Sequence, residues 1–210
     1  NAFNSWFILI MKKSEELEDL IFSFKSLPGI SQKLAEKIAV FLINQDDAYI
    51  ENFIDVLKQA KNQVHFCSKC NNICNNEICD ICENTERDSS KLCIVSTSED
   101  LDKIEETNSY NGKYYVLNGE INVKSKSSID KKILTKLMDI LRLNNIKEVI
   151  LATNWTPNGE ATAYFLKKII NEISEKTSIY RLAVGLPINS ALNYADNETL
   201  SQAIKNKKKY

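Results

Sequence analysis

Apolar residues in the first third of the chain recur at the spacing of helices. Leu17, Leu20, Ile21 and Phe24 occupy positions i, i+3, i+4 and i+7, which form one face of a helix. The same spacing recurs at Leu34, Ile38, Phe41 and Leu42, and again at Ile50, Phe53, Ile54 and Leu57. The pattern therefore predicts three short amphipathic helices that form a small helical unit ahead of residue 64.

A Pro-Gly turn separates the first two predicted helices. Pro28 and Gly29 stop the first helix, and Ser31 is suited to cap the amino end of the second. Two helices joined in this way can direct backbone amides at a DNA phosphate, and Lys33 and Lys37, one helical turn apart, can neutralise neighbouring phosphates. An ordinary connector with two solvated lysines explains the stretch as well as a helix-hairpin-helix does.

The pattern changes after residue 90 to short β-rich runs that alternate with helical ones. The predicted strands are Leu92–Val95, Tyr114–Leu117, Glu148–Thr153 and Ser178–Val184. Helical patterns at Ile129–Leu141 and Ala161–Ile173 lie between them. This alternation favours an α/β fold with an open, mainly parallel sheet covered by helices on both faces.

The carboxyl ends of the predicted strands, where such sheets place their functional edge, carry polar residues. The segments that follow the strands are Ser96 to Asp100, Asn118 to Glu120, Thr153 with Asn154, and Gly185 to Pro187. They contain no paired carboxylates, no nucleophile beside a base and no glycine-rich phosphate loop. Asp100 and Glu160 fit the amino ends of helices better than a catalytic role, so we predict no catalytic residue.

Two C-x-x-C pairs lie between these two halves. Cys67 and Cys70 form the first pair, and Cys79 and Cys82 form the second. Two such pairs at this separation can supply four thiolates to one tetrahedral ion, and zinc is the ion that this donor set favours. Four thiolates leave no open coordination position, so we predict one structural zinc ion per chain.

Disulfides and free buried cysteines are the alternatives. Disulfides require an oxidising compartment, and the sequence shows no secretory signal. Cys74 and Cys93 do not fit the spacing of the pairs, and Cys93 lies in an apolar run, as a small buried residue would. His65 precedes the first pair by two residues and is not expected to bind the ion, because four thiolates already satisfy it.

Composition and charge change this picture little. The 210 residues are 43% hydrophobic and carry a net charge of −1, so binding to nucleic acid requires a local basic patch. Two lysine clusters either contact phosphate or are simply solvated: Lys124, Lys126, Lys131 and Lys132, and Lys205, Lys207, Lys208 and Lys209.

No apolar run approaches the roughly 20 residues that span a bilayer, and we expect a soluble, cytoplasmic protein. We assign no role to the extension formed by residues 1–12.

Taken in order, these features resemble the RecR family of bacterial recombination mediators. The matching segments are Leu27-Pro-Gly-Ile with Lys33 and Lys37, the four paired cysteines, Arg87-Asp88, Cys93-Ile-Val, Glu148-Val-Ile-Leu-Ala-Thr-Asn, Gly159-Glu-Ala-Thr-Ala, Gly185-Leu-Pro and Tyr194-Ala-Asp. The match runs without interruption from about Lys13 to the end of the sequence. The ordered set is specific, although each piece alone is not.

The resemblance implies a helix-hairpin-helix domain over residues 13–63, a C4-type zinc finger over 64–89 and a Toprim domain over 90–186. A loop, a short helix and a basic tail follow over 187–210. It also implies a non-enzymatic, DNA-binding mediator of DNA repair whose subunits form a clamp-like dimer or tetramer ring. Such proteins bind single- and double-stranded DNA and act with RecO and RecF to help load RecA at gaps. DNA contacts carry over to Lys33 and Lys37, and zinc ligands to Cys67, Cys70, Cys79 and Cys82.

Several positions depart from the family pattern. Ser31 stands in place of a second hairpin glycine, Ser96 in place of a glutamate and Trp155 in place of a proline, and Ile188 to Ser190 replace a glycine-rich run. A Toprim-type, metal-dependent enzyme acting on nucleic acid is the alternative from another class. Its chemistry needs several carboxylates to hold magnesium, whereas Ser96, Thr153 and Asn154 stand where they would be sought. A sequence-specific zinc regulator is a third interpretation, but no major-groove helix is recognisable.

Overall fold

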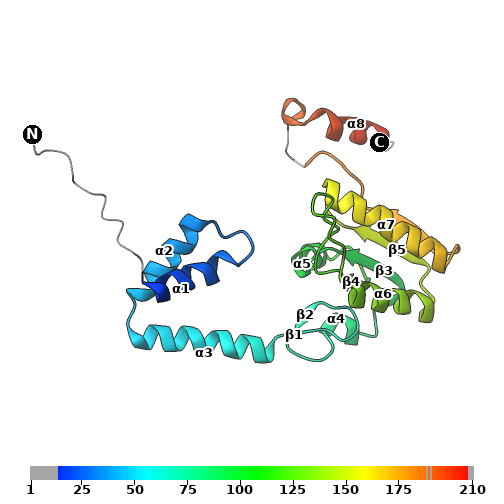
Figure 1. The fold of residues 1–210 in the computed structure, drawn as a ribbon. Helices are drawn as coiled ribbons and strands as arrows, with labels where there is room; N and C mark the ends of the chain where they lie inside the picture. Colours follow the sequence, from blue (N-terminus) through cyan, green and yellow to red (C-terminus); the bar gives the residue numbers. More distant parts are fainter. Residues whose placement is uncertain (1–13, 188, 190, 208–210) are drawn as a thin grey trace, which may run out of the picture. The chain divides into compact units, whose positions relative to one another are not determined.

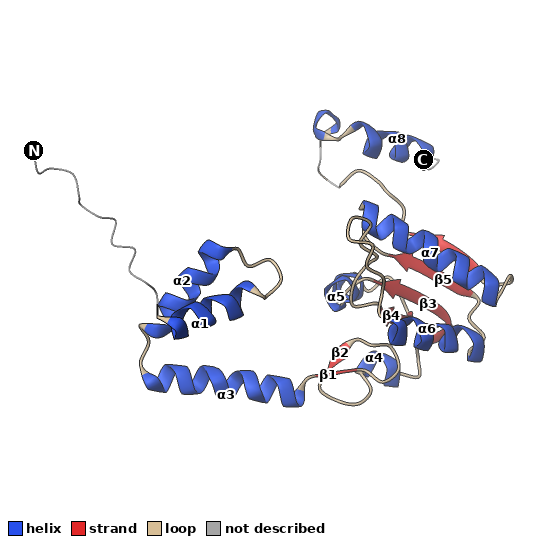
Figure 2. Ribbon diagram, in the orientation of Figure 1, coloured by secondary structure: helices blue, strands red, loops and turns tan. Residues whose placement is uncertain are grey.

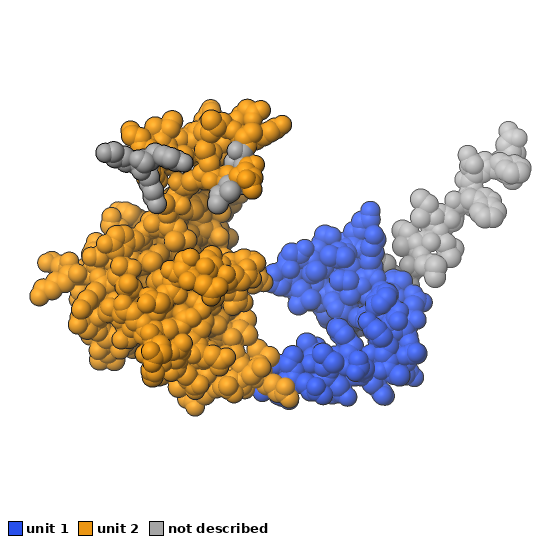
Figure 3. All heavy atoms as spheres, turned by 180° about the vertical axis from the view of Figure 1, so that it is seen from behind, with its two compact units in different colours: residues 1–62 blue, residues 63–210 orange. Residues whose placement is uncertain are grey.

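A computed structural model describes residues 14–187, 189 and 191–207. The chain divides into two compact units, Asn1–Asn62 and Gln63–Tyr210, which are coloured separately in Figure 3. The extension predicted at residues 1–12 and the ends of the altered loop at 188 and 190 lie outside the described residues. None of the helices described is long and apolar enough to cross a membrane.

The first unit contains the three predicted helices, α1 (Glu15–Lys25), α2 (Gln32–Ile43) and α3 (Asp47–Gln63) (Figure 1). Helix α1 begins where the Ser14 hydroxyl accepts a hydrogen bond from the amide of Leu17, and its first turn is acidic, which suits the positive end of the helix dipole. Ile21 of α1 packs against Ala35 and Ala39 of α2, and these three residues are buried. The face predicted for α1 is therefore its core face.

The helix predicted at α2 is confirmed, but its apolar face is not the face that packs against α1. Leu34 and Phe41 are 42% and 52% exposed, and two alanines are buried in their place. Small side chains at this contact allow the backbones of α1 and α2 to approach closely, which apolar periodicity alone does not reveal. The apolar face predicted for α3 is also largely exposed, and no residue of α3 is buried.

The second unit begins with a small two-stranded sheet and a short helix and continues into a four-stranded sheet with helices (Figure 2). In chain order its elements are β1 (His65–Phe66), β2 (Ile73–Cys74), α4 (Asp80–Glu83), β3 (Asp88–Val95), α5 (Ser98–Glu106), β4 (Gly112–Val116), α6 (Lys131–Leu143), β5 (Glu148–Ala152), α7 (Pro157–Ile173), β6 (Ser178–Arg181), a 3-10 turn (Leu192–Tyr194) and α8 (Asn197–Lys205).

The larger sheet confirms the predicted α/β architecture. Its strands run in the order β4-β3-β5-β6, and every neighbouring pair is parallel. Helices α6 and α7 cover one face, with Leu137 and Leu166 fully buried against it, and α5 covers the other face through Leu101. Both faces of the central strands are therefore buried, as their continuous apolar runs require.

Helix α5 and the end of strand β6 differ from the sequence predictions for the larger sheet. Helix α5 was not predicted, because its sequence is mostly charged; a reciprocal capping box between Thr97 and Asp100 starts it, and Leu101 anchors it to the sheet. Strand β6 ends at Arg181 and not at Val184. Its neighbour in the described sheet, β5, ends at Ala152, which stands opposite Leu182 in the parallel register, so residues beyond Leu182 have no strand of this sheet with which to pair.

The start of α7 offers a test of this packing. A Cβ atom on Gly159 would lie 2.0 Å from the backbone oxygen of Asn154, whereas one on Gly185 would have no atom within 4 Å. We predict that Gly159→Ala costs about 2–3 kcal/mol of stability because the backbone must shift. Its melting temperature should fall by roughly 4–12 °C, and that of the control Gly185→Ala should barely change. Thermal unfolding followed by circular dichroism measures both; equal melting temperatures would contradict the close approach of α7 to β5.

Candidate metal centre and nucleic-acid interface

The four paired cysteines lie together in the second unit. The sulfur atoms of Cys67, Cys70, Cys79 and Cys82 are all within 4.8 Å of one another, and the first three side chains are buried. These four form the only cluster of possible metal ligands within the described residues. Cys74 and His65 pair across β1 and β2 and lie outside this group of four.

Local backbone geometry brings the sulfur atoms together. After Cys70, Asn71 takes the left-handed conformation at φ 64°, and the Cys67 amide closes the turn by donating to the Asn72 oxygen at 2.7 Å. Cys79 precedes α4, and the amide of Cys82 donates to its carbonyl at 2.9 Å. The Cys67 sulfur accepts the amides of Lys69 and Cys79 at 3.4 and 3.3 Å, which fix its position in the turn. Each pair is thus a tight turn with its sulfurs facing inward.

The donor set and its spacing fit a tetrahedral ion. Zinc–sulfur bonds of about 2.3 Å place the sulfurs of a tetrahedral site about 3.8 Å apart. The sulfurs of Cys70 and Cys79 are 3.5 Å apart, and no pair exceeds 4.8 Å. With all four positions held by protein, neither water nor substrate could reach such an ion, so the cluster is able to bind a metal but not to use it in catalysis.

The thiols influence one another strongly. The pKa of Cys79 is lowered because its sulfur accepts hydrogen bonds from Cys70 and then Cys82, while donating to Cys79 raises the pKa of Cys70. A cation takes the place of the shared protons and permits all four sulfurs to ionise. Cys93 behaves differently, because burial in the core raises its pKa to about 12. It is a small buried residue, as predicted.

The cysteine cluster is joined to the edge of the larger sheet. Edge strand β4 donates its Val116 amide to the Cys70 oxygen at 2.9 Å, and the Asn71 side chain returns a bond to the Val116 oxygen at 2.9 Å. The Lys113 ammonium donates to three carbonyls at the end of α4, those of Ile81, Cys82 and Asn84. The cluster therefore covers backbone groups that an edge strand would otherwise expose.

In the first unit, the predicted hairpin is a tight turn between α1 and α2. Gly29 has φ 77°, and the Ile30 amide donates to the Leu27 oxygen at 3.3 Å, which closes the turn. The Ser31 hydroxyl caps α2 by accepting the Leu34 amide at 3.3 Å. Ser31 has φ −77°, so replacing glycine there causes no backbone strain. The first-turn amides of Gln32 and Lys33 remain without an intrahelical partner.

Lys33 and Lys37 lie on one side of α2 beside this turn. Both are exposed, and both line a shallow hollow together with Glu36, Val40 and Phe41. Neither ammonium forms an ion pair within the part of the chain that is described. The structure thus brings the two predicted lysines together. The lysines of the two sequence clusters that the structure describes are exposed in the second unit, namely Lys124, Lys126, Lys131, Lys132, Lys205 and Lys207, and Lys208 and Lys209 lie outside the described residues.

The carboxyl edge of the larger sheet centres on Glu120, for which no role was predicted. Its Oε1 atom accepts the Ser96 hydroxyl at 2.6 Å and both the amide and the side-chain nitrogen of Asn154 at 2.9 and 3.0 Å. Positive φ angles at Asn118 and Gly119 turn the chain back so that Glu120 reaches Ser96. Glu120 is therefore a single carboxylate that ties together the ends of β3 and β5.

The other acids of this edge have structural roles, as predicted. Asp100 caps α5, and Glu160 in the first turn of α7 pairs with Arg181. Trp155 stacks on the same Arg181, with the guanidinium carbon 4.4 Å from the ring centroid. No three acidic side chains gather into a possible metal site in the residues described.

Comparison with known proteins connects these features. Residues 17–61 match the family described as RecR, helix-hairpin-helix; residues 90–183 match the Toprim domain; and residues 185–208 match RecR, C-terminal. The chain is 43% identical over 199 residues to the recombination protein RecR of Ureaplasma urealyticum serovar 10, covering 95% of this chain and 98% of that protein. It is 39% identical to RecR of Lactococcus lactis subsp. cremoris, covering 92% and 96%, and 38% identical to RecR of Bifidobacterium adolescentis, covering 90% and 93%.

Fold and site together define a Toprim-domain protein with a helix-hairpin-helix module and a four-cysteine, metal-binding cluster. The similarity to these relatives extends over both units, including residues 62–89, which lie between the helix-hairpin-helix and Toprim matches. The chain belongs to the RecR family of recombination proteins.

The metal centre yields a direct prediction. We expect one tightly bound ion per chain, whose loss removes a contribution of about 10–16 kcal/mol, comparable with the stability of a whole domain. Cys79→Ser should therefore lose the ion and melt at a markedly lower temperature. Cys74→Ser, in the same segment but outside the cluster, should keep both the ion and the melting temperature. Elemental analysis and thermal unfolding of the two variants measure this; full metal content in Cys79→Ser would contradict the closed site.

Proposed function

We propose that this protein is a DNA-binding recombination mediator in DNA repair, which forms a clamp-like oligomer on DNA. It acts with RecO and RecF to help load RecA at gaps, in the cytoplasm. Membership of the RecR family along 95% of the chain is the observation that carries the proposal. The exposed hairpin, with unpaired amides beside Lys33 and Lys37, supports DNA binding by the first unit.

Each segment then has its own task. Residues 13–63 contact DNA, and residues 64–89 fold around one structural zinc ion held by Cys67, Cys70, Cys79 and Cys82. Residues 90–186 form the Toprim domain, and residues 187–210 follow as a loop, a short helix and a basic tail. The spacing of the sulfurs, close to that of a tetrahedral site, supports zinc as the ion.

The hairpin holds DNA by its phosphates. Backbone amides and two lysines do not suit bidentate contacts with base edges, so binding is electrostatic and independent of sequence. Single- and double-stranded DNA both present phosphates to such a site. One hairpin makes few contacts, and useful affinity therefore requires several copies in one assembly, where linked sites raise the effective concentration.

The apolar face of α3 supports assembly from several copies. Phe53 is 45% exposed, and Leu57 is 62% exposed. Leaving two large side chains of one helix face in water forgoes about 1.5–3 kcal/mol for each that could be buried. A second copy that covers this face would recover that energy and bring two hairpins into one particle.

Removing the two lysines tests the proposed DNA contact. Lys33→Ala combined with Lys37→Ala should weaken binding to every DNA sequence, because neutralised phosphates contribute irrespective of the bases. The slope of log affinity against log salt should fall by up to about 1.8 for each hairpin on duplex DNA. Fluorescence anisotropy with labelled duplexes and single strands over a salt series measures this.

The matched control removes the same charge from the other unit, as Lys167→Ala with Lys176→Ala, both exposed. The control should keep the wild-type affinity and slope, and both variants should keep their metal and oligomeric state. An unchanged slope in the Lys33 and Lys37 variant would place the DNA path elsewhere.

The alternative is a Toprim-type enzyme that cleaves or synthesises nucleic acid with a metal. Magnesium chemistry at phosphorus needs several carboxylates, whereas Glu120 is the acid held between Ser96 and Asn154. We therefore expect no cleavage or synthesis when the pure protein is incubated with labelled DNA and magnesium or manganese. Activity that copurifies with the protein and disappears in Glu120→Gln would establish the enzyme instead.

A further inference from the structure

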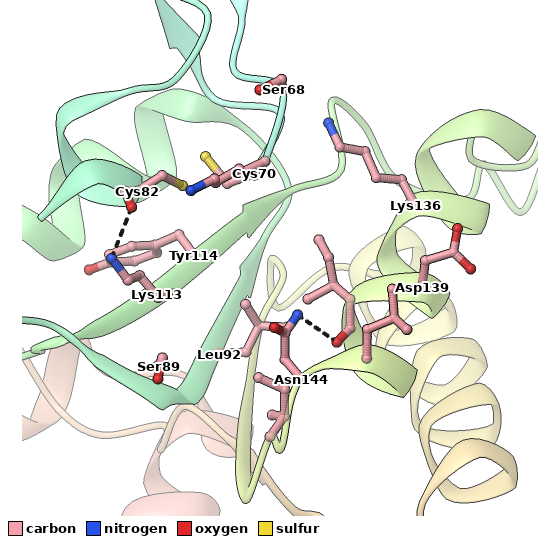
Figure 4. Close-up of a pocket in the computed structure, with 14 residues that line it drawn as sticks. Ser68, Cys70, Cys82, Ser89, Leu92, Lys113, Tyr114, Lys136, Asp139 and Asn144 are labelled. Carbon is pink, nitrogen blue, oxygen red and sulfur yellow. Dashed lines mark hydrogen bonds between the residues drawn. The ribbon is translucent and has the colours of Figure 1, made fainter. Parts of the chain in front are cut away.

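A groove of about 480 Å³ lies beside the cysteine cluster in the second unit (Figure 4). Its walls come from the turn between Cys67 and Cys70, from α4, strand β3, edge strand β4 and helix α6, and from the loop that follows α6. Cys70 and Cys82 of the metal cluster lie in its wall, whereas the hairpin belongs to the other unit. Its volume falls in the range of sites that hold a small ligand or a short peptide segment.

One wall of the groove is apolar. Leu143, the last residue of α6, is 83% exposed, and Ile140 one turn earlier also lines the groove. Leu92 and Ile146, which are nearly buried, lie at its base. An exposed leucine above an apolar floor leaves hydrophobic surface that a bound side chain would cover.

Another part of the groove is cationic. Lys69, Lys113 and Lys136 line it, and none forms an ion pair with a carboxylate within the described residues. The acid that lines the groove, Asp139, has Arg142 at 3.8 Å. Three ammonium groups therefore line the groove, against one carboxylate that already has a cation beside it.

Two of the three ammonium groups, those of Lys113 and Lys136, are held in place before any ligand arrives. The Lys136 ammonium donates to the Cys67 oxygen at 3.2 Å, and the Lys113 ammonium donates to three carbonyls near α4. Figure 4 shows Lys136 on α6 facing Ser68 and Cys70 across the groove. On α6, Lys136, Ile140 and Leu143 follow one another at i, i+4 and i+7, so a single helix face passes from cationic to apolar. Rigid walls reduce the entropic cost of binding.

We propose that this groove binds a short acidic segment of a partner protein that ends in a large apolar residue. The carboxylates of the segment face Lys69 and Lys136, and its apolar side chain packs against Ile140 and Leu143. DNA fits less well, because a phosphate backbone has nothing to cover the apolar wall. The inference goes beyond the proposed function, since it requires neither DNA binding nor the hairpin.

Binding of labelled peptides tests the proposal. The probes are fluorescein-labelled hexapeptides with three aspartates followed by two glycines and a final Leu, Phe or Trp, together with versions in which lysine replaces aspartate. We expect at least one acidic probe to bind the metal-loaded protein with a Kd of about 10–100 µM, as a small, partly charged contact allows. The lysine versions should not bind, and affinity should fall with salt.

Variants locate the site. Leu143→Ser with Lys69→Ala should weaken binding at least tenfold, because it removes both the apolar wall and a free ammonium. Leu192→Ser with Lys124→Ala removes an exposed leucine and an exposed lysine elsewhere in the same unit, and should bind as the wild type does. Elemental analysis and circular dichroism confirm that both variants keep their metal and fold.

Three outcomes would overturn the proposal. The first is that no acidic probe binds below 1 mM, on the order of 100 times weaker than the expected tight limit. The second is that a short DNA strand displaces a bound probe and itself binds more weakly to the Leu143 and Lys69 variant, which would make the groove a nucleic-acid site. The third is a change of oligomer mass in the Leu143 and Lys69 variant, which would make it a contact between subunits. None depends on the hairpin lysines, so failure here leaves the proposed function standing.

Discussion

The convergence of four sulfur atoms is the constraint on which the middle of the chain depends. Strands β1 and β2 have two residues each, and α4 has four, so none of them is stable by itself. Bound metal would supply the missing stability, and it would do so where the chain passes from helices to the larger sheet. The bonds between Cys70, Asn71 and Val116 carry that order into edge strand β4. One closed centre thus organises its own segment, protects a sheet edge and shapes the wall of a groove.

Different interactions dominate in the two units. The second unit is held by a buried apolar core and a rigid polar joint, and its functional surfaces are preorganised. The first unit has a small core around Ile21 and relies on exposed amides and charges, whose contributions are individually weak and screened by salt. Under the proposed function, such a protein would gain affinity for DNA by combining copies, and not by improving any one contact.

Sequence periodicity predicted the elements whose burial follows a regular pattern. Residue spacing was enough to predict the parallel strands β3, β4 and β5, the helices α6 and α7, and the four cysteines, because each depends on a local sequence pattern. The sequence was not enough where packing between elements determines which residues are buried. It did not distinguish Ala35 and Ala39 from Phe41 as the buried residues of α2, because that choice depends on how closely α1 approaches. Helix α5 was not predicted because its sequence is mostly charged and shows little apolar periodicity. Its capping box and one buried leucine are sufficient to form it. Glu120 and the groove depend on residues far apart in the chain, which spacing cannot bring together.

The central claim is that several copies enclose DNA and do not merely adhere to it. Retention on circular DNA tests this most directly. The protein is loaded at low salt on a gapped circular duplex, and the salt concentration is then raised until complexes on a linear gapped duplex of the same sequence dissociate. The fraction of protein that remains on the circle is measured before and after the circle is cut once. A clamp remains on the intact circle, because screening of phosphate contacts leaves topological linkage unaffected, and it is lost when the circle is cut. Equal release from circular and linear DNA at every salt concentration would contradict a clamp.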